Sequence, residues 1–152
     1  MAEYAYALQN QLVWQKAVKL AVMVIKMSEK LPRTWAAEVI AKQIVRSSGS
    51  VCANIAEGYG RYSPAAQRHH FSIARGEAYE TDGWLAVLLE TGYITSATQA
   101  EIHAACVEVI KLLTSKMVDL EHQIAAAPKP KQTLKEAAEL YEVEIQSIEH
   151  ET

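Results

Sequence analysis

The sequence contains little that would interrupt a helix, with only six glycines and four prolines among 152 residues. Half of the residues are apolar, and alanine, the strongest helix former, is abundant. Long helices are therefore favoured over a turn-rich sheet. A chain of this length forms about one domain with a single sizeable core.

Signals for membranes and secretion are also missing. No apolar run approaches the roughly 20 residues that cross a bilayer, and the N-terminus lacks the basic start and apolar stretch of a signal peptide. Only two cysteines, Cys52 and Cys106, are present, each beside small or apolar residues in a helical pattern. We therefore expect reduced core thiols in a cytoplasmic protein without a membrane partner, while the spacing leaves a disulfide between them open.

Recognisable signatures of catalysis are absent as well. The chain has no Glu-x-x-His pair, which a di-metal site in a helical bundle requires. It has no Gly-x-Ser-x-Gly elbow and no Walker-type phosphate loop, and Gly58-x-Gly60 lacks the third glycine of a dinucleotide site. His69 and His70 are adjacent, so their side chains point in different directions around a helix. We expect a protein that is not an enzyme, with no catalytic residue, no metal and no cofactor.

Apolar residues recur at steps of three and four along four segments, which predicts four helices. The expected ranges are residues 8–30, 35–59, 64–91 and 96–124. Four such helices joined by short loops predict an all-α fold, an up-down-up-down antiparallel four-helix bundle that occupies residues 1–124. The bounds rest on N-capping signals and on terminating glycines, which are Thr34, Ser63 before Pro64, Ser96-x-x-Gln99, Gly58, Gly60 and Gly92.

Each predicted helix has one stripe that we expect to face the core. In chain order the stripes are Trp14, Ala17, Ala21, Val24, Ser28 and Leu31; Ile40, Ile44, Ser47 or Ser48, Val51 and Ile55; Phe71, Ala74 or Arg75, Ala78, Leu85, Leu88 and Gly92; and Ile102, Cys106, Val109, Leu113, Met117, Leu120 and Ile124. The second helix is rich in small residues, which lets a neighbouring backbone come close. The three tryptophans, Trp14, Trp35 and Trp84, are expected to be core or interface anchors.

A linker and an acidic tail follow the bundle. Residues 125–131 contain two prolines, which keep the chain extended and fairly stiff. Residues 132–152 open with the capping box Thr133-x-x-Glu136 and predict an extra C-terminal amphipathic helix. A helix of about 15 residues is marginal alone in water, so its apolar stripe is expected to dock on a partner. The docking residues of that stripe are Leu134, Tyr141, Ile145 and Ile148.

Charge is distributed unevenly along the chain. Residues 132–152 hold six glutamates and one lysine, a balance of −5, while the net charge of the whole chain is −3. The remaining residues therefore carry about +2, which falls short of a dedicated nucleic-acid binder. Four arginines between residues 42 and 75 form a candidate phosphate-contacting face on the second and third helices, namely Arg46, Arg61, Arg68 and Arg75.

Asn54, Glu57 and Arg61 fall on one side of a helix that is otherwise small or apolar, where an unpaired amide or carboxylate is costly. The predicted polar network consists of Asn54, Glu57 and Glu80. In the structural interpretation, Asn54 and Glu57 bond across to the third helix, with Glu80 and Arg75 as partners, and fix the helix register. Glu77 is expected to face solvent.

Three stretches carry a family resemblance. They are LVWQKAVKL at residues 12–20, RSSGSVCANIAEGYGRYS at residues 46–63 and FSIARGEAYETDGWL at residues 71–85. Here the chain strongly resembles the 23S rRNA intervening-sequence proteins over about residues 8–124. Positions that match the recurring residues of the family are Asn54, Glu57, Gly58, Arg61, Gly76 and Glu80, while Glu77 stands where a serine is usual.

The resemblance implies an antiparallel four-helix bundle that assembles into a ring-like homopentamer. A related bundle, the accessory protein of diversity-generating retroelements, binds a reverse transcriptase and nucleic acid, which favours RNA or DNA as a partner. We expect a non-enzymatic, homo-oligomeric adaptor that binds a protein partner, a nucleic acid or both, with the four arginines as the candidate contacts to nucleic acid. The alternative is a protein-interaction module whose C-terminal helix docks on a neighbouring subunit or on another protein.

Overall fold

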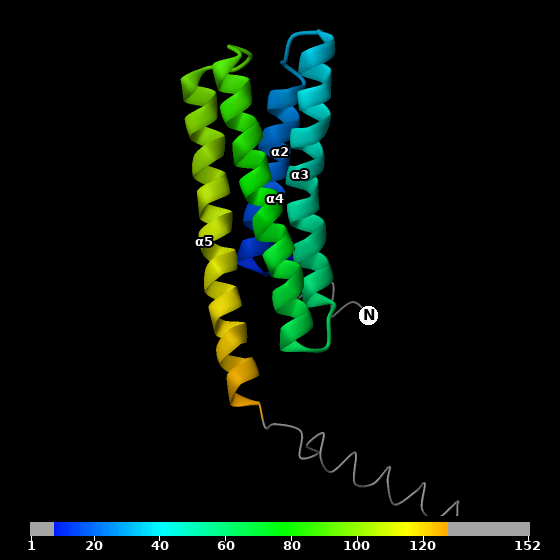
Figure 1. Ribbon diagram of the computed structural model, residues 1–152, viewed down its shortest axis with the longest axis vertical. Helices are drawn as coiled ribbons and strands as arrows, with labels where there is room; N and C mark the ends of the chain where they lie inside the picture. Colours follow the sequence, from blue (N-terminus) through cyan, green and yellow to red (C-terminus); the bar gives the residue numbers. More distant parts are fainter. Residues whose placement is uncertain (1–7, 128–152) are drawn as a thin grey trace, which may run out of the picture.

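The computed structural model describes residues 8–127, which form four helices and no strand (Figure 1). The helices are α2 (Leu12–Ser28), α3 (Trp35–Tyr59), α4 (Pro64–Glu90) and α5 (Ser96–Ala126). α3 packs on α4, α4 packs on α5, and α2 closes the ring against α3 and α5. This arrangement is the up-down-up-down bundle that the sequence predicts. The expected C-terminal helix lies outside the described residues.

The N-terminal caps explain where the helices begin. The Thr34 hydroxyl accepts a hydrogen bond from the Ala37 N–H, and Ser63 does the same for Ala66, each over 3.2 Å. Both caps confirm the prediction. The cap of α5 is Thr95 rather than Ser96, because the extended backbone of Thr95 lets its hydroxyl accept from the Thr98 N–H. The predicted capping box is therefore wrong by one residue.

Three glycines near the helix ends have different roles. Gly92 follows α4 with φ of +72°, a left-handed conformation that favours glycine. Gly60 caps α3 in a right-handed conformation, so it ends the helix without positive φ. Gly58, predicted to help stop α3, lies buried inside it. A Cβ there would come within 2.6 Å of the Phe71 ring, so Gly58 serves the close packing of α3 on α4.

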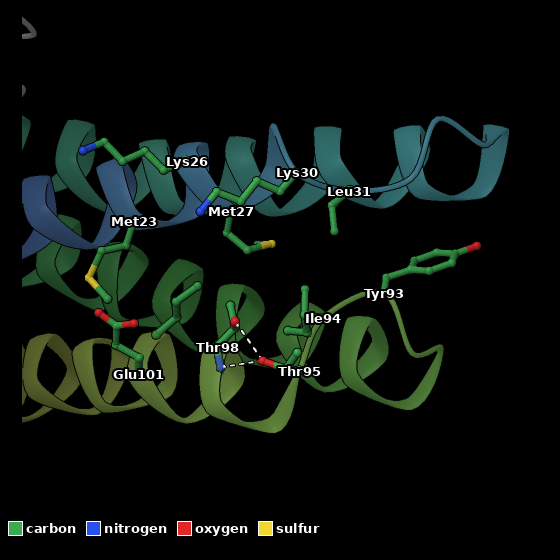
Figure 2. Close-up of a pocket in the computed structure, with 11 residues that line it drawn as sticks. Met23, Lys26, Met27, Lys30, Leu31, Tyr93, Ile94, Thr95, Thr98 and Glu101 are labelled. Atoms are coloured by element: carbon green, nitrogen blue, oxygen red, sulfur yellow. Dashed lines mark hydrogen bonds between the residues drawn. The ribbon is translucent and has the colours of Figure 1, made fainter.

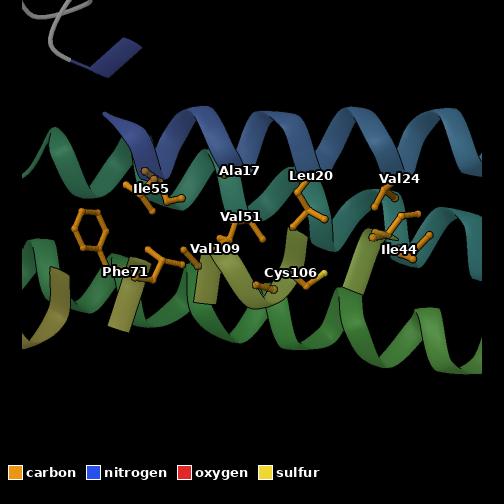
Figure 3. Close-up of a cluster of buried hydrophobic side chains, with 14 of the residues drawn as sticks. Ala17, Leu20, Val24, Ile44, Val51, Ile55, Phe71, Cys106 and Val109 are labelled. Carbon is orange, nitrogen blue, oxygen red and sulfur yellow. The ribbon is translucent and has the colours of Figure 1, made fainter. Parts of the chain in front are cut away.

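One apolar cluster fills the bundle from end to end, and Figure 3 shows its central part. The α5 stripe is buried as predicted from Ile102 to Leu120, whereas Ile124 is 39% exposed. In α2 the predicted phase is wrong in part. Trp14 is only partly buried, and the core positions are Val13, Ala17, Leu20, Val24 and Met27. Nearly every side of α2 carries apolar residues, so spacing alone does not fix which side faces inward.

Both cysteines are free thiols. Burial raises the pKa of Cys106 to about 12, with a further contribution from the negative charge of Asp82. Burial also raises the pKa of Cys52. Both groups are therefore protonated and poorly reactive at neutral pH. Across residues 8–127, no helix has the length and apolarity needed to span a bilayer.

Candidate interaction surfaces

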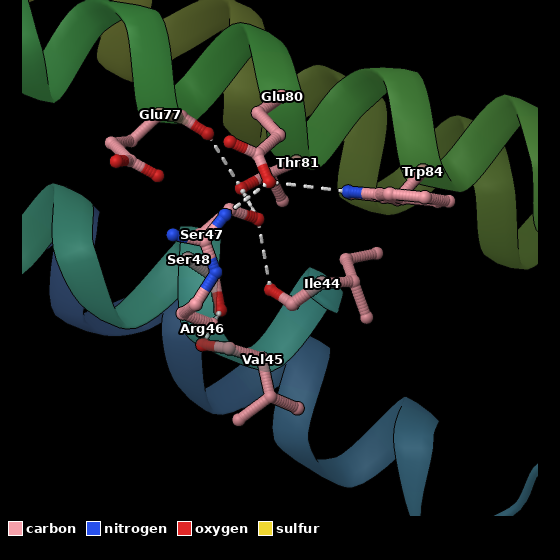
Figure 4. Close-up of polar contacts among 9 residues, drawn as sticks. All are labelled: Ile44, Val45, Arg46, Ser47, Ser48, Glu77, Glu80, Thr81 and Trp84. Carbon is pink, nitrogen blue, oxygen red and sulfur yellow. Dashed lines mark hydrogen bonds and ion pairs between the residues drawn. The ribbon is translucent and has the colours of Figure 1, made fainter. Parts of the chain in front are cut away.

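Two buried hydroxyls join α3 and α4 near the middle of the bundle (Figure 4). The Ser47 and Thr81 hydroxyl oxygens lie 2.9 Å apart, and both side chains are inaccessible to solvent. Thr81 also donates to the Glu77 carbonyl oxygen over 2.8 Å. A buried pair of this kind tolerates little sliding of one helix along the other, because a displaced hydroxyl would lose its partner. The sequence stripe for α4 missed Thr81.

An ion pair covers these hydroxyls on the solvent side. The Arg46 guanidinium donates to Glu80 Oε1 over 2.7 Å, and the Trp84 indole N–H reaches the same oxygen over 3.3 Å. Arg46 remains more than half exposed. The pair therefore contributes modestly to stability, but it holds the Trp84 ring against the seam.

Glu77 does not face solvent as predicted. Its side chain is only partly exposed, and its Oε2 atom is inaccessible to water and has no hydrogen-bond partner among the described residues. Burial raises the pKa of Glu77, and the nearby Glu80 carboxylate raises it further, while Arg46 acts in the opposite direction. Glu77 Oε2 is thus a buried carboxylate oxygen at the seam without a hydrogen bond among the described residues, and the nearby Arg46 charge offsets its burial only in part.

Glu57 and Arg61 meet His70 where α3 ends beside α4. The Arg61 Nε–H donates to His70 Nε2 over 2.9 Å, which requires the neutral ring to carry its proton on Nδ1. Glu57 Oε2 lies 3.3 Å from that Nδ1 and 3.7 Å from the Arg61 guanidinium. Sequence reasoning did not assign a role to His70, because the antiparallel register that brings it to Arg61 is not visible in one helix.

The three predicted network residues are not joined to one another. The Asn54 amide donates to the Ser50 carbonyl oxygen within α3 and does not bond across to α4. Glu57 belongs to the Arg61–His70 group and Glu80 to the Arg46–Trp84 group. Asn54 therefore forms its hydrogen bond within its own helix. The register between α3 and α4 is held by the Ser47–Thr81 pair and the two ionic groups instead.

The four predicted arginines fall into two groups. Arg46 and Arg61 lie along the α3–α4 seam, whereas Arg68 and Arg75 lie on the opposite side of α4, against α5. Arg68 pairs with Glu121 of α5. Arg75 reaches only the Thr114 hydroxyl, over a long 3.4 Å. The structure therefore does not gather the four guanidiniums on one face, and Arg75 is the only one of them without an acidic partner among the described residues.

Exposed apolar side chains gather on the outside of the α3–α4 pair. We name this surface the α3–α4 face and define it by Trp35, Val39, Ile73 and Val87 with Gly49, Gly76 and Gly83 between them. Val39 and Val87 lie at one level, because each is seven residues from a member of the Arg46–Glu80 pair. Trp35 is 80% exposed at the start of α3, and a Cβ added at any of the three glycines would meet no atom within 4 Å.

A groove of about 390 Å³ opens between the end of α2 and the start of α5 (Figure 2). Its floor is apolar and continuous with the core, and Met27 points into it. Lys26 and Lys30 run along the α2 rim, and Glu101 lies on the α5 rim. The volume falls within the range of ligand and side-chain pockets.

Ionisable groups elsewhere in the described part do not converge. No three histidine, cysteine or acidic side chains within residues 8–127 lie close enough together to hold a metal ion. His103 pairs with Asp82 over 2.7 Å on the α4–α5 side. The docking residues predicted in the tail lie outside the described residues; they are Leu134, Tyr141, Ile145 and Ile148.

These features define an antiparallel four-helix bundle whose unusual parts are surfaces rather than an enclosed site. The chain belongs to the 23S rRNA-intervening sequence protein family, whose model matches residues 9–115. It is also similar to a crystal structure from Bacteroides thetaiotaomicron VPI-5482, described as a protein of unknown function from the S23 ribosomal protein family. That match has 35% identity and a TM-score of 0.66, and covers 70% of this chain and 98% of the other. None of the curated proteins compared with the chain matches it.

Proposed function

We propose that the protein is a non-enzymatic adaptor of the cytoplasm that assembles with copies of itself through the α3–α4 face. The observation that carries this proposal is the exposure of Trp35, Val39 and Val87 on the side of α3 and α4 that also carries the Arg46–Glu80 pair. Exposed apolar side chains that share one surface mark interaction sites in soluble proteins. An exposed tryptophan is also the side chain most often found at the energetic centre of an interface.

The same face offers both protruding and recessed elements. Trp35 and Val87 project, while Gly49, Gly76 and Gly83 leave the helix backbones open to close approach. A surface that carries both can pack against its own copy, because one copy supplies the side chain and the other the recess. The ring of five subunits that the family resemblance implies would place such a contact at each subunit boundary.

Native mass measurement tests this proposal with a matched pair of variants. Val87→Arg places a charge on the α3–α4 face, and Val22→Arg places the same charge on the outer side of α2, where the exposure is similar (39% and 43%). We expect Val87→Arg to lower the particle mass at micromolar concentration while Val22→Arg leaves it unchanged. Wild-type protein that is monomeric at about 0.1 mM, or equal behaviour of both variants, contradicts the proposal.

A nucleic-acid surface is the second element of the proposal, and Arg75 favours its position on the α4–α5 side. Arg75 has only a weak hydroxyl contact, so its charge is available to phosphate. Tyr79 lies one turn further along α4 and is 59% exposed, which suits base stacking. Lys111 lies one turn from Thr114 and forms no ion pair with the described residues. Assembly would multiply these contacts through avidity.

Fluorescence anisotropy with labelled single-stranded RNA and DNA tests this second element. We expect saturable binding at about 50 mM salt, with log affinity falling linearly in log salt concentration. Arg75→Ala should weaken binding and reduce the salt slope by about one. Arg46→Ala is the control, because Arg46 is already paired with Glu80. Equal losses in both variants would contradict the placement on α4–α5, and no binding at low salt would contradict the nucleic-acid partner itself.

A further inference from the structure

The groove between α2 and α5 has the shape of a receptor for an apolar helix face. It extends over the end of α2 and the turn that follows, from Met23 to Leu31, and along α5 from the Thr95 cap to Ile102, which is about 10.5 Å of helix. Met27 and Ile102 form a buried floor, and Tyr93 and Ile94 close one end. A groove of this length and depth accommodates two or three large side chains from successive turns of a helix.

The rim of the groove adds a charge preference. Lys26 lies in the last turn of α2 and Lys30 lies two residues beyond its end; both line the groove, and neither forms an ion pair with the described residues. Glu101, on the opposite rim, is their only acidic counterpart in the groove lining. The α2 rim therefore favours an occupant that presents carboxylates beside its apolar side chains.

We propose that this groove binds residues 132–152 of a second copy of the chain. The predicted apolar stripe of that segment includes Tyr141, Ile145 and Ile148, which span about 10.5 Å as a helix and match the groove length. Glu142 and Glu149 border the stripe on one side, where they would face the two lysines. Net charges of −5 on the segment and positive charge on the rim are complementary.

The length of α5 assigns the segment to another copy rather than to the same chain. Thr98, in the groove, and Ala127 are about 44 Å apart along the 31-residue helix. Residues 128–131 span at most about 14 Å when extended, and a helix from residue 132 to Tyr141 adds about 14 Å. A helical segment therefore cannot bring Tyr141 back to its own groove, whereas a neighbouring copy can supply it.

This inference concerns a different surface from the α3–α4 face, so the two proposals can fail separately. Anisotropy of a labelled peptide of residues 130–152, titrated with a chain ended after residue 127, measures groove occupancy without any need for self-assembly. The truncated chain is a suitable receptor, because 70% of this chain already matches 98% of the solved relative. Circular dichroism confirms that each variant remains helical before the titration.

We expect saturable binding that Lys26→Glu with Lys30→Glu weakens at least tenfold. Lys111→Glu with Lys116→Glu carries the same charge change away from the groove and should weaken binding less than threefold. Glu101→Lys should strengthen it, because it removes the repulsion on the α5 rim. A peptide with Tyr141→Ala, Ile145→Ala and Ile148→Ala should not bind.

Three outcomes overturn the proposal. Absence of saturable peptide binding means that the groove serves a different occupant. Equal weakening by the two lysine double variants means that the peptide responds to overall charge rather than to this rim. Binding that survives the triple-alanine peptide unchanged means that the apolar stripe does not seat in the groove. In each case the particle masses of Val87→Arg and Val22→Arg still test, independently, whether the protein assembles through the α3–α4 face.

Discussion

The α3–α4 seam and the α2–α5 boundary show two ways of joining neighbouring helices. The seam is closed by small residues, a buried hydroxyl pair and two ionic groups, one beside the hydroxyls and one at the end of α3. The α2–α5 boundary has one ion pair among the described residues, Lys16 with Glu108 at 2.7 Å, and opens into the groove. α2 is also the shortest helix, and α5 runs past it at one end of the bundle (Figure 1). Register is therefore determined mainly at the seam, and room for a partner remains at the boundary.

The largest expected difference compares one core residue from each region. Phe71→Ala should lower the free energy of unfolding by about 3–5 kcal/mol, because it removes the buried ring that packs against Gly58 and leaves a cavity. Met27→Ala should cost about 2 kcal/mol, since its side chain already borders the open groove. Urea denaturation measures both. A larger loss for Met27→Ala would show that the α2–α5 boundary contributes more to stability than the α3–α4 seam.

A smaller effect follows from one substitution at two glycines of α3. Gly58→Ala should destabilise by about 1–3 kcal/mol, because its Cβ would overlap the Phe71 ring. Gly49→Ala is the matched control. Its Cβ would meet open space, so it should stabilise the monomer by about 0.5–1 kcal/mol through helix propensity. Thermal unfolding of both variants provides the comparison, and equal effects would show that the close approach at Gly58 is not limiting.

Polar contacts should differ by less. Thr81→Val should cost about 1 kcal/mol, because the hydrogen bond between the two helices is lost while Ser47 still donates to the Ile44 carbonyl oxygen. Lys16→Ala removes an exposed ion pair and should cost less than about 1 kcal/mol. The double variant Ser47→Ala with Thr81→Val should cost less than the sum of its single variants, since each single variant already removes the bond that the two hydroxyls share. Additive losses in urea titrations would show that the two hydroxyls do not act as a pair.

Glu77 gives the smallest effect, and it depends on pH. Because burial and Glu80 raise its pKa in the folded protein, the folded state holds the proton more tightly than the unfolded chain. Its contribution to stability is present at acidic pH and is lost as the pH rises through the raised pKa. Glu77→Gln should therefore raise the melting temperature at pH 7, and this gain should shrink as the pH falls below the ordinary carboxyl range. Glu101→Gln, at an exposed position, controls for the amide itself.

Local signals in the sequence predict much of the fold. The bounds of α3 agree residue for residue with the prediction, because Thr34 provides an unambiguous cap. The α5 stripe from Ile102 to Leu120 is also correct, since polar residues separate its apolar positions. In α2, apolar residues surround the helix, so its inward side was predicted only in part. At the start of α5, Thr95 and Ser96 are both capable caps, and only the backbone conformation decides between them.

The candidate sites depend on pairing between helices, which one sequence pattern does not contain. Each arginine looks available in its own helix, but the antiparallel register brings Glu80 to Arg46, Glu121 to Arg68 and His70 to Arg61. Among these four arginines, only Arg75 has no acidic partner among the described residues. Glu77 was expected in solvent, and its approach to Arg46 of α3 depends on the same register. The groove is likewise invisible in the sequence, since the two segments that line it lie far apart along the chain.

The length of α5 gives the molecule a direction. The groove and the C-terminal end of α5 lie at opposite poles of the bundle, about 44 Å apart. A contact between such poles would be head-to-tail, so each copy would donate at one end and accept at the other. Whether successive copies close into a ring or grow into a filament would then depend on the rotation between neighbours, and a single bend at a pole would decide it.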